Sequence, residues 1–165
     1  MLETLKKHHA KATFYVLGSR VDFYPNLAKQ IVREGHEIGN HSWSHKDLTT
    51  LPPEMIQEEV DQTNEAIEKA TGSAPKTVRP PYGASNEEVM AAIGLPSILW
   101  TVDTMDWKTK NADDILKQVK ENTKDGSIIL MHDIHKATAE SLNQVLFFLD
   151  EEGYELVTVS ELMNG

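Results

Sequence analysis

The sequence of 165 residues contains no cysteine. This absence excludes disulfide bonds, cysteine-ligated zinc and a cysteine nucleophile. It does not fix the cellular compartment, because a chain of this length can build a core without disulfides. No apolar stretch approaches the roughly 20 residues that a membrane-spanning helix needs. The first residues also lack the apolar run of a signal peptide. These absences leave one globular domain without a membrane span as the prediction.

Basic residues are also scarce relative to acidic ones. The 16 Lys and Arg residues face 26 Asp and Glu residues, which gives a formal net charge of −10. A surface of this sign repels nucleic acid. We therefore expect no nucleic-acid partner and a neutral or locally cationic substrate, although acidity that only aids solubility is also consistent with these numbers.

Short apolar runs alternate with amphipathic segments along the chain. The runs predicted as strands are 12–17, 36–39, 77–79, 97–102, 127–131 and 154–159. The segments predicted as helices are 25–34, 54–70, 86–93, 112–121 and 137–152, after an initial helix end at 1–7. This β-α-β-α order indicates parallel strands, roughly six in number, joined by right-handed crossovers. An open doubly wound sheet and a (β/α) barrel both fit it.

Polar side chains with catalytic potential follow the predicted strands. In both architectures the chemistry lies at the carboxyl ends of the strands, so these side chains are expected at one edge. The residues at these ends are His41, His45, Arg79, Tyr82, Asp103, Asp106, Trp107, His132 and Asp133. Their common placement is more informative than any one of them, since each alone also has a structural explanation.

His41 and His45 are four residues apart in His-Ser-Trp-Ser-His. Neutral imidazole is a common ligand for zinc and similar divalent ions. No Glu follows His41, so the zincin pattern is absent. The alternative is a pair of exposed or capping histidines, but their place after a strand favours metal binding.

The remaining strand ends carry other kinds of chemistry. The stiff Arg79-Pro-Pro-Tyr82-Gly turn is able to aim an arginine at a carboxylate and a backbone N–H at an oxyanion, or is only a structural turn. Trp107 either forms the wall of a small pocket or packs in the core. His132, at the end of a strand, is a candidate general acid or base, or a satisfied core histidine.

Four of these segments together resemble the second to fifth motifs of the carbohydrate esterase family 4 polysaccharide deacetylases, also called the NodB-homology domain. They occur in the family's order, and the resemblance covers essentially the whole chain. It is greatest for the bacterial peptidoglycan and chitooligosaccharide deacetylases. The matching segments are His41-Ser-Trp-Ser-His45, Arg79-Pro-Pro-Tyr82, Asp106-Trp107 and Leu130-Met-His132.

This resemblance implies a distorted (β/α) barrel that removes acetyl groups from the N-acetylglucosamine units of a polysaccharide. His41 and His45 would ligate a divalent metal ion, with zinc the first candidate and cobalt, manganese or nickel as alternatives. Arg79 would orient the catalytic base, and Tyr82 would donate its backbone N–H to the oxyanion. An extracellular or cell-wall location follows from the same resemblance.

The acid side of the reaction is implied in the same way. Asp106 would orient and tune His132, the general acid, whereas Trp107 and Leu130 would line the acetate pocket. Two alternatives use the same residues. One is a protein that binds metal and glycan without turnover, and the other is an O-acetyl xylan esterase.

One family motif has no match in this chain. The family carries an Asp-Asp-Gly motif on its first barrel strand, which supplies the catalytic base and a third metal ligand, but no such motif precedes Lys11. Asp113 and Asp114 do not replace it, because they begin a predicted helix. Residues 1–165 are therefore expected to be a catalytic domain that lacks the first strand and is inactive alone. A separate chain supplying the motif is one possible partner.

Overall fold

The computed structural model describes residues 1–165 and divides them into two compact units. The central unit is Thr13–Leu99, and the terminal unit combines Met1–Ala12 with Trp100–Gly165. None of the helices combines the length and the apolar composition that crossing a membrane requires.

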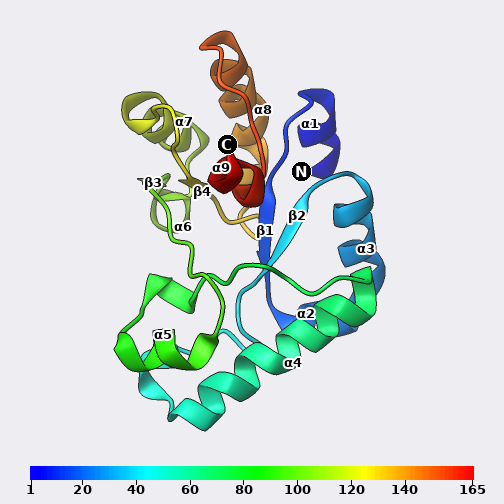
Figure 1. Cartoon of the computed structure of the whole chain (residues 1–165). Helices are drawn as coiled ribbons and strands as arrows, with labels where there is room; N and C mark the ends of the chain where they lie inside the picture. Colours follow the sequence, from blue (N-terminus) through cyan, green and yellow to red (C-terminus); the bar gives the residue numbers. More distant parts are fainter. The chain divides into compact units, whose positions relative to one another are not determined.

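The central unit contains a small parallel sheet. Strand β1, Thr13–Val16, pairs in parallel with β2, Glu37–Asn40, and the two lie side by side in Figure 1. Parallel pairing continues through single bridges from Asn40 to Val78 and from Val78 to Ser97. The sheet therefore consists of a four-residue ladder between β1 and β2 and of isolated bridges beyond it. Asn40 takes part in both the ladder and the first bridge.

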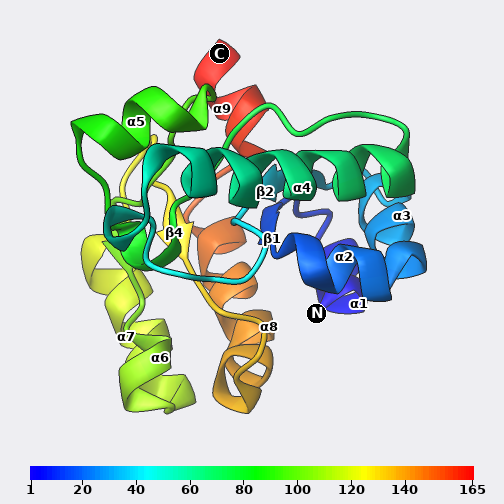
Figure 2. The ribbon, with the colours of Figure 1, turned by 90° about the horizontal axis from the view of Figure 1, so that it is seen from below.

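Helices of the central unit pack around its longest helix. The elements are α2 Gly18–Phe23, α3 Pro25–Arg33, α4 Pro53–Thr71 and α5 Glu87–Ile93, with the short 3-10 turns η1 Leu48–Thr50 and η2 Pro81–Gly83. Helix α4 contacts α2, α3 and α5, as Figure 2 shows along its length. The buried core is Leu48, Ile56, Val60, Val78, Val89 and Ile93.

Local sequence signals explain where these helices begin and end. Pro53 opens α4 at a position where a missing N–H costs nothing, and Gly72 ends it in the left-handed region at φ 85°. The Asn86 side chain accepts from Val89 N–H and so caps α5. Gly18 permits a close approach, because a Cβ there would lie 2.5 Å from Thr63 Oγ1.

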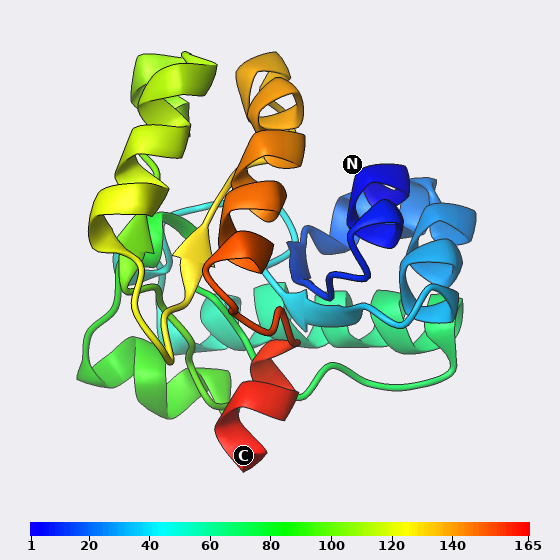
Figure 3. The same ribbon diagram turned by 90° about the horizontal axis from the view of Figure 1, so that it is seen from above.

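The terminal unit holds a second pair of parallel strands and the remaining helices. Its elements are α1 Leu2–Lys7, β3 Val102–Asp103, α6 Asp106–Thr109, α7 Ala112–Asn122, β4 Ile129–Leu130, α8 Lys136–Glu151 and α9 Val159–Asn164. Strand β3 pairs with β4, and α7 packs along α8 (Figure 3). The core between these helices is Ile115, Val119, Ala137, Val145 and Leu149.

The predicted helices are confirmed, as are the strands at 12–17 and 36–39, although β1 is only half-buried. The other strand predictions were too long or wrong. Residues 77–79 pair only through Val78, which forms one bridge with Asn40 and one with Ser97. The run 97–102 is reduced to the bridge at Ser97 and the two-residue strand β3, and the run 127–131 is reduced to the two-residue strand β4. Residues 154–159 form no strand, because Thr158 caps helix α9. The prediction missed α2, α6 and α9.

Candidate functional site

The first group of predicted site residues lies in the central unit. His41 follows β2, and its ring centroid is 5.0 Å from that of His45. The ring of Tyr82, from η2, lies 4.9 Å from His45. Three residues from two separate motifs are therefore neighbours, and we call His41 and His45 the imidazole pair.

A hydrogen bond fixes which ring nitrogen of His41 carries the hydrogen. Its Nδ1 lies 2.5 Å from the backbone oxygen of Arg79, which is only an acceptor. Nδ1 must therefore carry the hydrogen, and the neutral ring keeps a lone pair on Nε2. Metal-ligating histidines are commonly oriented in this way by a backbone carbonyl.

The loop that carries the imidazole pair has an unusual backbone. Ser42 and His45 have φ values of 67° and 63°, in the left-handed region that side chains rarely adopt. Asn40, fully buried, accepts from Ser42 N–H at 2.8 Å, and Ser42 Oγ accepts from His45 N–H at 3.0 Å. These bonds hold the loop in a conformation that it would not adopt by local preference.

The imidazole pair fits part of a metal site. Two imidazoles a few ångströms apart supply two ligands of the kind that zinc prefers, whereas hydrolytic zinc sites have three protein ligands. The chain holds no group of three or more His, Cys, Asp or Glu side chains arranged to hold a metal ion. The residues present therefore suit two positions of a coordination sphere, not a complete one.

Arg79 is engaged with the backbone of its own unit. Its Nε donates to Ile98 O and its Nη2 to Leu99 O, both at 2.9 Å. Its guanidinium lies 4.2 Å from the centroid of the Tyr15 ring. Burial lowers the pKa of Arg79, and the nearby Tyr15 opposes this shift. These contacts fix the guanidinium firmly, and the predicted role of Arg79 in orienting a base stays a prediction.

Tyr82 occupies a strained position in the turn that the sequence predicted. Its φ is 61°, inside the turn η2, and its side chain is 69% exposed. The first N–H groups of a helical turn have no partner within that turn. The backbone N–H of Tyr82 is such a group, which is what the predicted oxyanion contact requires.

The second group of predicted residues lies in the terminal unit. Asp106 is fully buried, and its Oδ1 lies 2.7 Å from His132 Nδ1. Asp106 Oδ2 accepts from the backbone N–H of His132 at 2.6 Å and from Thr138 Oγ1 at 2.7 Å. Trp107 N–H donates to Oδ1 as well, at 2.8 Å.

These hydrogen bonds decide the charge of Asp106. Burial alone would raise its pKa, but hydrogen bonds from the His132 ring, His132 N–H and Thr138 outweigh burial, so the pKa is lowered. Asp106 is therefore an ionised acceptor, and His132 Nδ1 must carry the hydrogen. The His132 ring is thereby held in one orientation by the carboxylate.

Trp107 and Leu130, the two side chains predicted to line an acetate pocket, differ in exposure. Trp107 is the second residue of α6 and is 48% exposed, whereas Leu130 in β4 is buried. The backbone oxygen of Leu130 accepts from Thr104 Oγ1 at 2.7 Å, which ties β4 to the end of β3. The assignment of both side chains to an acetate pocket stays a prediction.

Comparison with known proteins gives the family. The model of the polysaccharide deacetylase family matches residues 1–98, more than half of the chain. The chain belongs to the polysaccharide deacetylase family. The predicted resemblance is confirmed, and so is the fold class, through solved deacetylase structures that match almost the whole chain.

Two bacterial relatives illustrate the similarity. The peptidoglycan N-acetylglucosamine deacetylase PgdA of Listeria monocytogenes is 49% identical over 98% of this chain and 35% of the relative. The peptidoglycan N-acetylmuramic acid deacetylase PdaC of Bacillus subtilis is 43% identical over the same shares. A structure of PdaC matches with a TM-score of 0.95 at 42% identity, covering 99% of this chain and 81% of that one.

A third similar structure is a carbohydrate esterase family 4 pseudoenzyme from Bacillus anthracis. It matches with a TM-score of 0.92 at 38% identity, over 98% of this chain and 58% of that one. This polysaccharide deacetylase chain spans about a third of the length of the two curated relatives above. The comparisons give no support to the prediction that a separate chain supplies the Asp-Asp-Gly motif.

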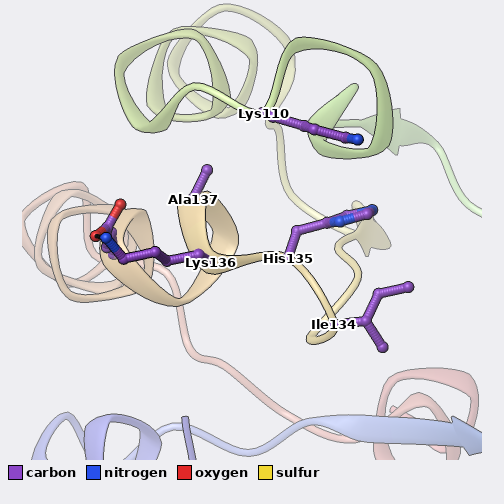
Figure 4. A pocket seen from close by; sticks show the side chains of 6 residues that line it. Lys110, Ile134, His135, Lys136 and Ala137 are labelled. Atoms are coloured by element: carbon purple, nitrogen blue, oxygen red, sulfur yellow. Dashed lines mark ion pairs between the residues drawn. The ribbon is translucent and has the colours of Figure 1, made fainter.

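Two surface pockets are lined in part by neighbours in sequence of the predicted site residues, not by those residues themselves. In the terminal unit a pocket of about 260 Å³ is lined by Lys110, Ile134, His135, Lys136, Ala137 and Glu140. Figure 4 shows the Lys110 and His135 side chains extending in the same direction, while Lys136 turns away to pair with Glu140. The rings of His132 and His135 are 6.0 Å apart. In the central unit a pocket of about 160 Å³ is lined by Trp43, Ser44, Lys46, Met55, Glu58, Glu59 and Gln62.

Sequence reasoning missed Thr138 and Glu59. Thr138, fully buried in α8, supports Asp106 from 32 residues away. Glu59, on α4, accepts from the N–H and the hydroxyl of Ser44. No spacing rule signals either contact, because both depend on how a distant helix packs. Burial would raise the pKa of Glu59, but the Ser44 hydrogen bonds outweigh it, so the pKa is lowered.

Proposed function

We propose that this chain is part of a metal-dependent enzyme that hydrolyses N-acetyl groups from the amino sugars of peptidoglycan and releases acetate. The observation that carries the proposal is the buried Asp106 carboxylate, which holds the His132 ring in one orientation through Nδ1. The names of PgdA and PdaC support peptidoglycan as the polymer. The imidazole pair adds a second set of residues suited to hydrolysis.

His132 serves as the general acid in this proposal. Cleavage of an acetamide produces an amine that must take up a proton to leave. The imidazolium form of His132 is stabilised by the ionised Asp106, which also holds the ring in one orientation. Protonation by a positioned side chain contributes typically about 10²–10⁴-fold to the rate. Thr138 keeps the Asp106 carboxylate in place.

Two further contributions come from the central unit. Tyr82 donates its backbone N–H to the oxyanion that develops at the acetamide carbonyl. A divalent ion held by His41 and His45, with zinc first and cobalt, manganese or nickel as alternatives, would supply Lewis-acid activation of water and of that carbonyl. Arg79 would orient the catalytic base. In the family this base belongs to the Asp-Asp-Gly motif, which does not occur before Lys11 in the given sequence.

The location follows from the substrate. Peptidoglycan is a cell-wall polymer, so we place the enzyme at the cell wall, outside the cytoplasmic membrane. Both N-acetylglucosamine and N-acetylmuramic acid are candidate units, since one appears in the name of each relative. A chitin-like polymer and O-acetylated xylan are the competing substrates.

Acetate release tests the proposal directly. A longer version of the protein, extended to carry the Asp-Asp-Gly motif, is incubated with zinc and peptidoglycan, N-acetylglucosamine oligomers or acetylated xylan. Acetate is expected from the first two substrates. His132→Gln in this version should lower the rate by about 10²–10⁴-fold, because the general acid is lost.

His135→Gln is the matched control, because its ring lies near His132 but has no hydrogen bond to Asp106. It should retain most of the rate. Equal rates for wild type and His132→Gln would refute the assignment of His132. Release of acetate from acetylated xylan alone would mean that the enzyme hydrolyses an ester and not an amide.

A glycan-binding protein without turnover is the second candidate function. The chain holds no group of three metal-ligating side chains, and a similar structure is that of a pseudoenzyme. A mutant of that pseudoenzyme is described as having restored enzymatic activity. Tight glycan binding with no acetate release from the longer version would select this candidate.

A further inference from the structure

The loop with the imidazole pair is attached to helix α4 at two points. Near its start, the Asn40 side chain donates to Val60 O at 2.9 Å and to Asn64 Oδ1 at 2.8 Å. Near its end, Glu59 accepts from Ser44 N–H. The loop between β2 and η1 is thus held by consecutive turns of one helix.

Glu59 makes the second attachment with both of its carboxylate oxygens. Oε2 accepts from Ser44 N–H at 2.8 Å, and Oε1 accepts from Ser44 Oγ at 2.5 Å. Oε1 also lies 3.5 Å from Lys46 Nζ. The Glu59 side chain is only 8% exposed, so its bonds to Ser44 face little competition from water.

Ser44 directly precedes His45, so its position determines where the second imidazole lies. His45 has a left-handed backbone, which an unrestrained loop would tend to leave. The hydrogen bond from His45 N–H to Ser42 Oγ restrains this residue directly. The hydrogen bonds of Glu59 to Ser44 restrain the residue before it. Removing the Glu59 carboxylate would loosen the position of His45, whereas His41 would stay bonded to Arg79 O.

We propose that Glu59 is a positioning residue that fixes His45 relative to His41 through Ser44, and thereby sets the affinity of the imidazole pair for a divalent ion. This inference rests on the proposed function, which makes these two histidines metal ligands. Outer-shell partners of metal ligands typically contribute about 10–100-fold to metal affinity. Glu59 would act in the same way, one residue further from the metal.

Zinc titration of the present chain by calorimetry tests this role, with cobalt absorption spectra as a second readout. Glu59→Ala should weaken zinc binding by roughly tenfold or more and change the cobalt spectrum. Glu59→Gln keeps an acceptor for Ser44 N–H and should recover most of the affinity. Glu58→Ala, on the same helix, removes an exposed carboxylate bonded only to Gln62 and should bind zinc as wild type does.

The outcomes separate this inference from the function on which it rests. If a His41→Ala, His45→Ala double variant binds zinc as wild type does, the metal assignment is wrong and the inference fails with it. If the double variant loses binding but Glu59→Ala does not, only the role of Glu59 is overturned. Should Glu59→Ala fail to fold, Glu59→Asp shortens the side chain and weakens both of its contacts with Ser44, and unchanged affinity there would overturn the role.

Discussion

Asp106 accepts four hydrogen bonds while fully buried, from Trp107 N–H, Thr138 Oγ1, His132 N–H and His132 Nδ1. A carboxylate of this kind has no spare acceptor capacity. Each of its oxygens accepts from one backbone N–H, and a backbone N–H can only donate. An acceptor is therefore needed at both oxygen positions of Asp106 for the stability of the fold, independent of catalysis.

Asp106→Asn is expected to lower the free energy of unfolding by roughly 1–3 kcal/mol near neutral pH. In either orientation the new amide NH₂ meets a backbone N–H, of Trp107 or of His132, so one buried donor loses its acceptor. Urea unfolding measures the change. Asp133→Asn, at an exposed neighbouring carboxylate, should stay within about 0.5 kcal/mol of wild type.

The pH dependence of this difference has a fixed sign. Since the folded-state pKa of Asp106 is lowered, its ionised form stabilises the fold above the unfolded pKa of about 3.9. That stabilisation is lost as pH falls through the lowered folded pKa. Unfolding curves of wild type and Asp106→Asn should therefore converge at acid pH. A difference that widens there would contradict the charge assigned to Asp106.

The site residues differ in how far sequence predicts them. His132 and Asp106 stand out because each follows an apolar run, and strand ends in α/β proteins carry chemistry. One of the hydrogen bonds that lower the pKa of Asp106 comes from Thr138, which lies on helix α8. Sequence order therefore pointed to Asp106 and His132, which the structure brings into contact, but not to Thr138, which supports Asp106.

Helix α8 shows the prediction that succeeds at the scale of elements. Its predicted inward residues Leu142, Val145, Leu146 and Leu149 are all buried. A helix carries its own hydrogen bonds, so a periodic apolar face is enough to define it. The terminal unit uses that face to pack α8 against α7.

Leu149→Ala should therefore cost about 2–5 kcal/mol of unfolding free energy, through lost burial and the cavity that remains. Leu149 is 2% exposed among the core residues of α7 and α8. Phe147→Ala, two residues earlier and 56% exposed, is the control and should change stability far less. Thermal or urea unfolding measures both. Similar losses in the two variants would contradict the packing of this helix.

Strands were predicted less well, because the backbone hydrogen bonds of a strand are made with a neighbouring strand and not within the segment itself. The apolar run at 97–102 pairs only at its ends, and the Ile98 and Leu99 oxygens accept from the Arg79 guanidinium. At 154–159, Thr158 and Glu161 form a capping box that starts α9. That Thr-x-x-Glu spacing was visible in the sequence and outweighs the β-branched composition.

For the whole molecule, the sequence predicted the family but not the contacts between distant residues. Family membership was accessible from the order of four motifs alone, and the family match over residues 1–98 confirms it. The contacts of each unit were not accessible, since they join residues such as Asn40 and Asn64 that no motif contains.

Zinc affinity should rise when the protein carries the Asp-Asp-Gly motif of its family. The present chain offers two imidazoles and no group of three ligands, so zinc should bind weakly. A carboxylate ligand adds a direct bond and a charge, which should exceed the roughly 10–100-fold effect of an outer-shell partner. Calorimetry on the present chain and on an extended version compares the two affinities. An extended version with both aspartates changed to asparagine is the control and should bind less tightly than its parent. Equal affinity in the present chain and the extended version would mean that the imidazole pair alone accounts for zinc binding.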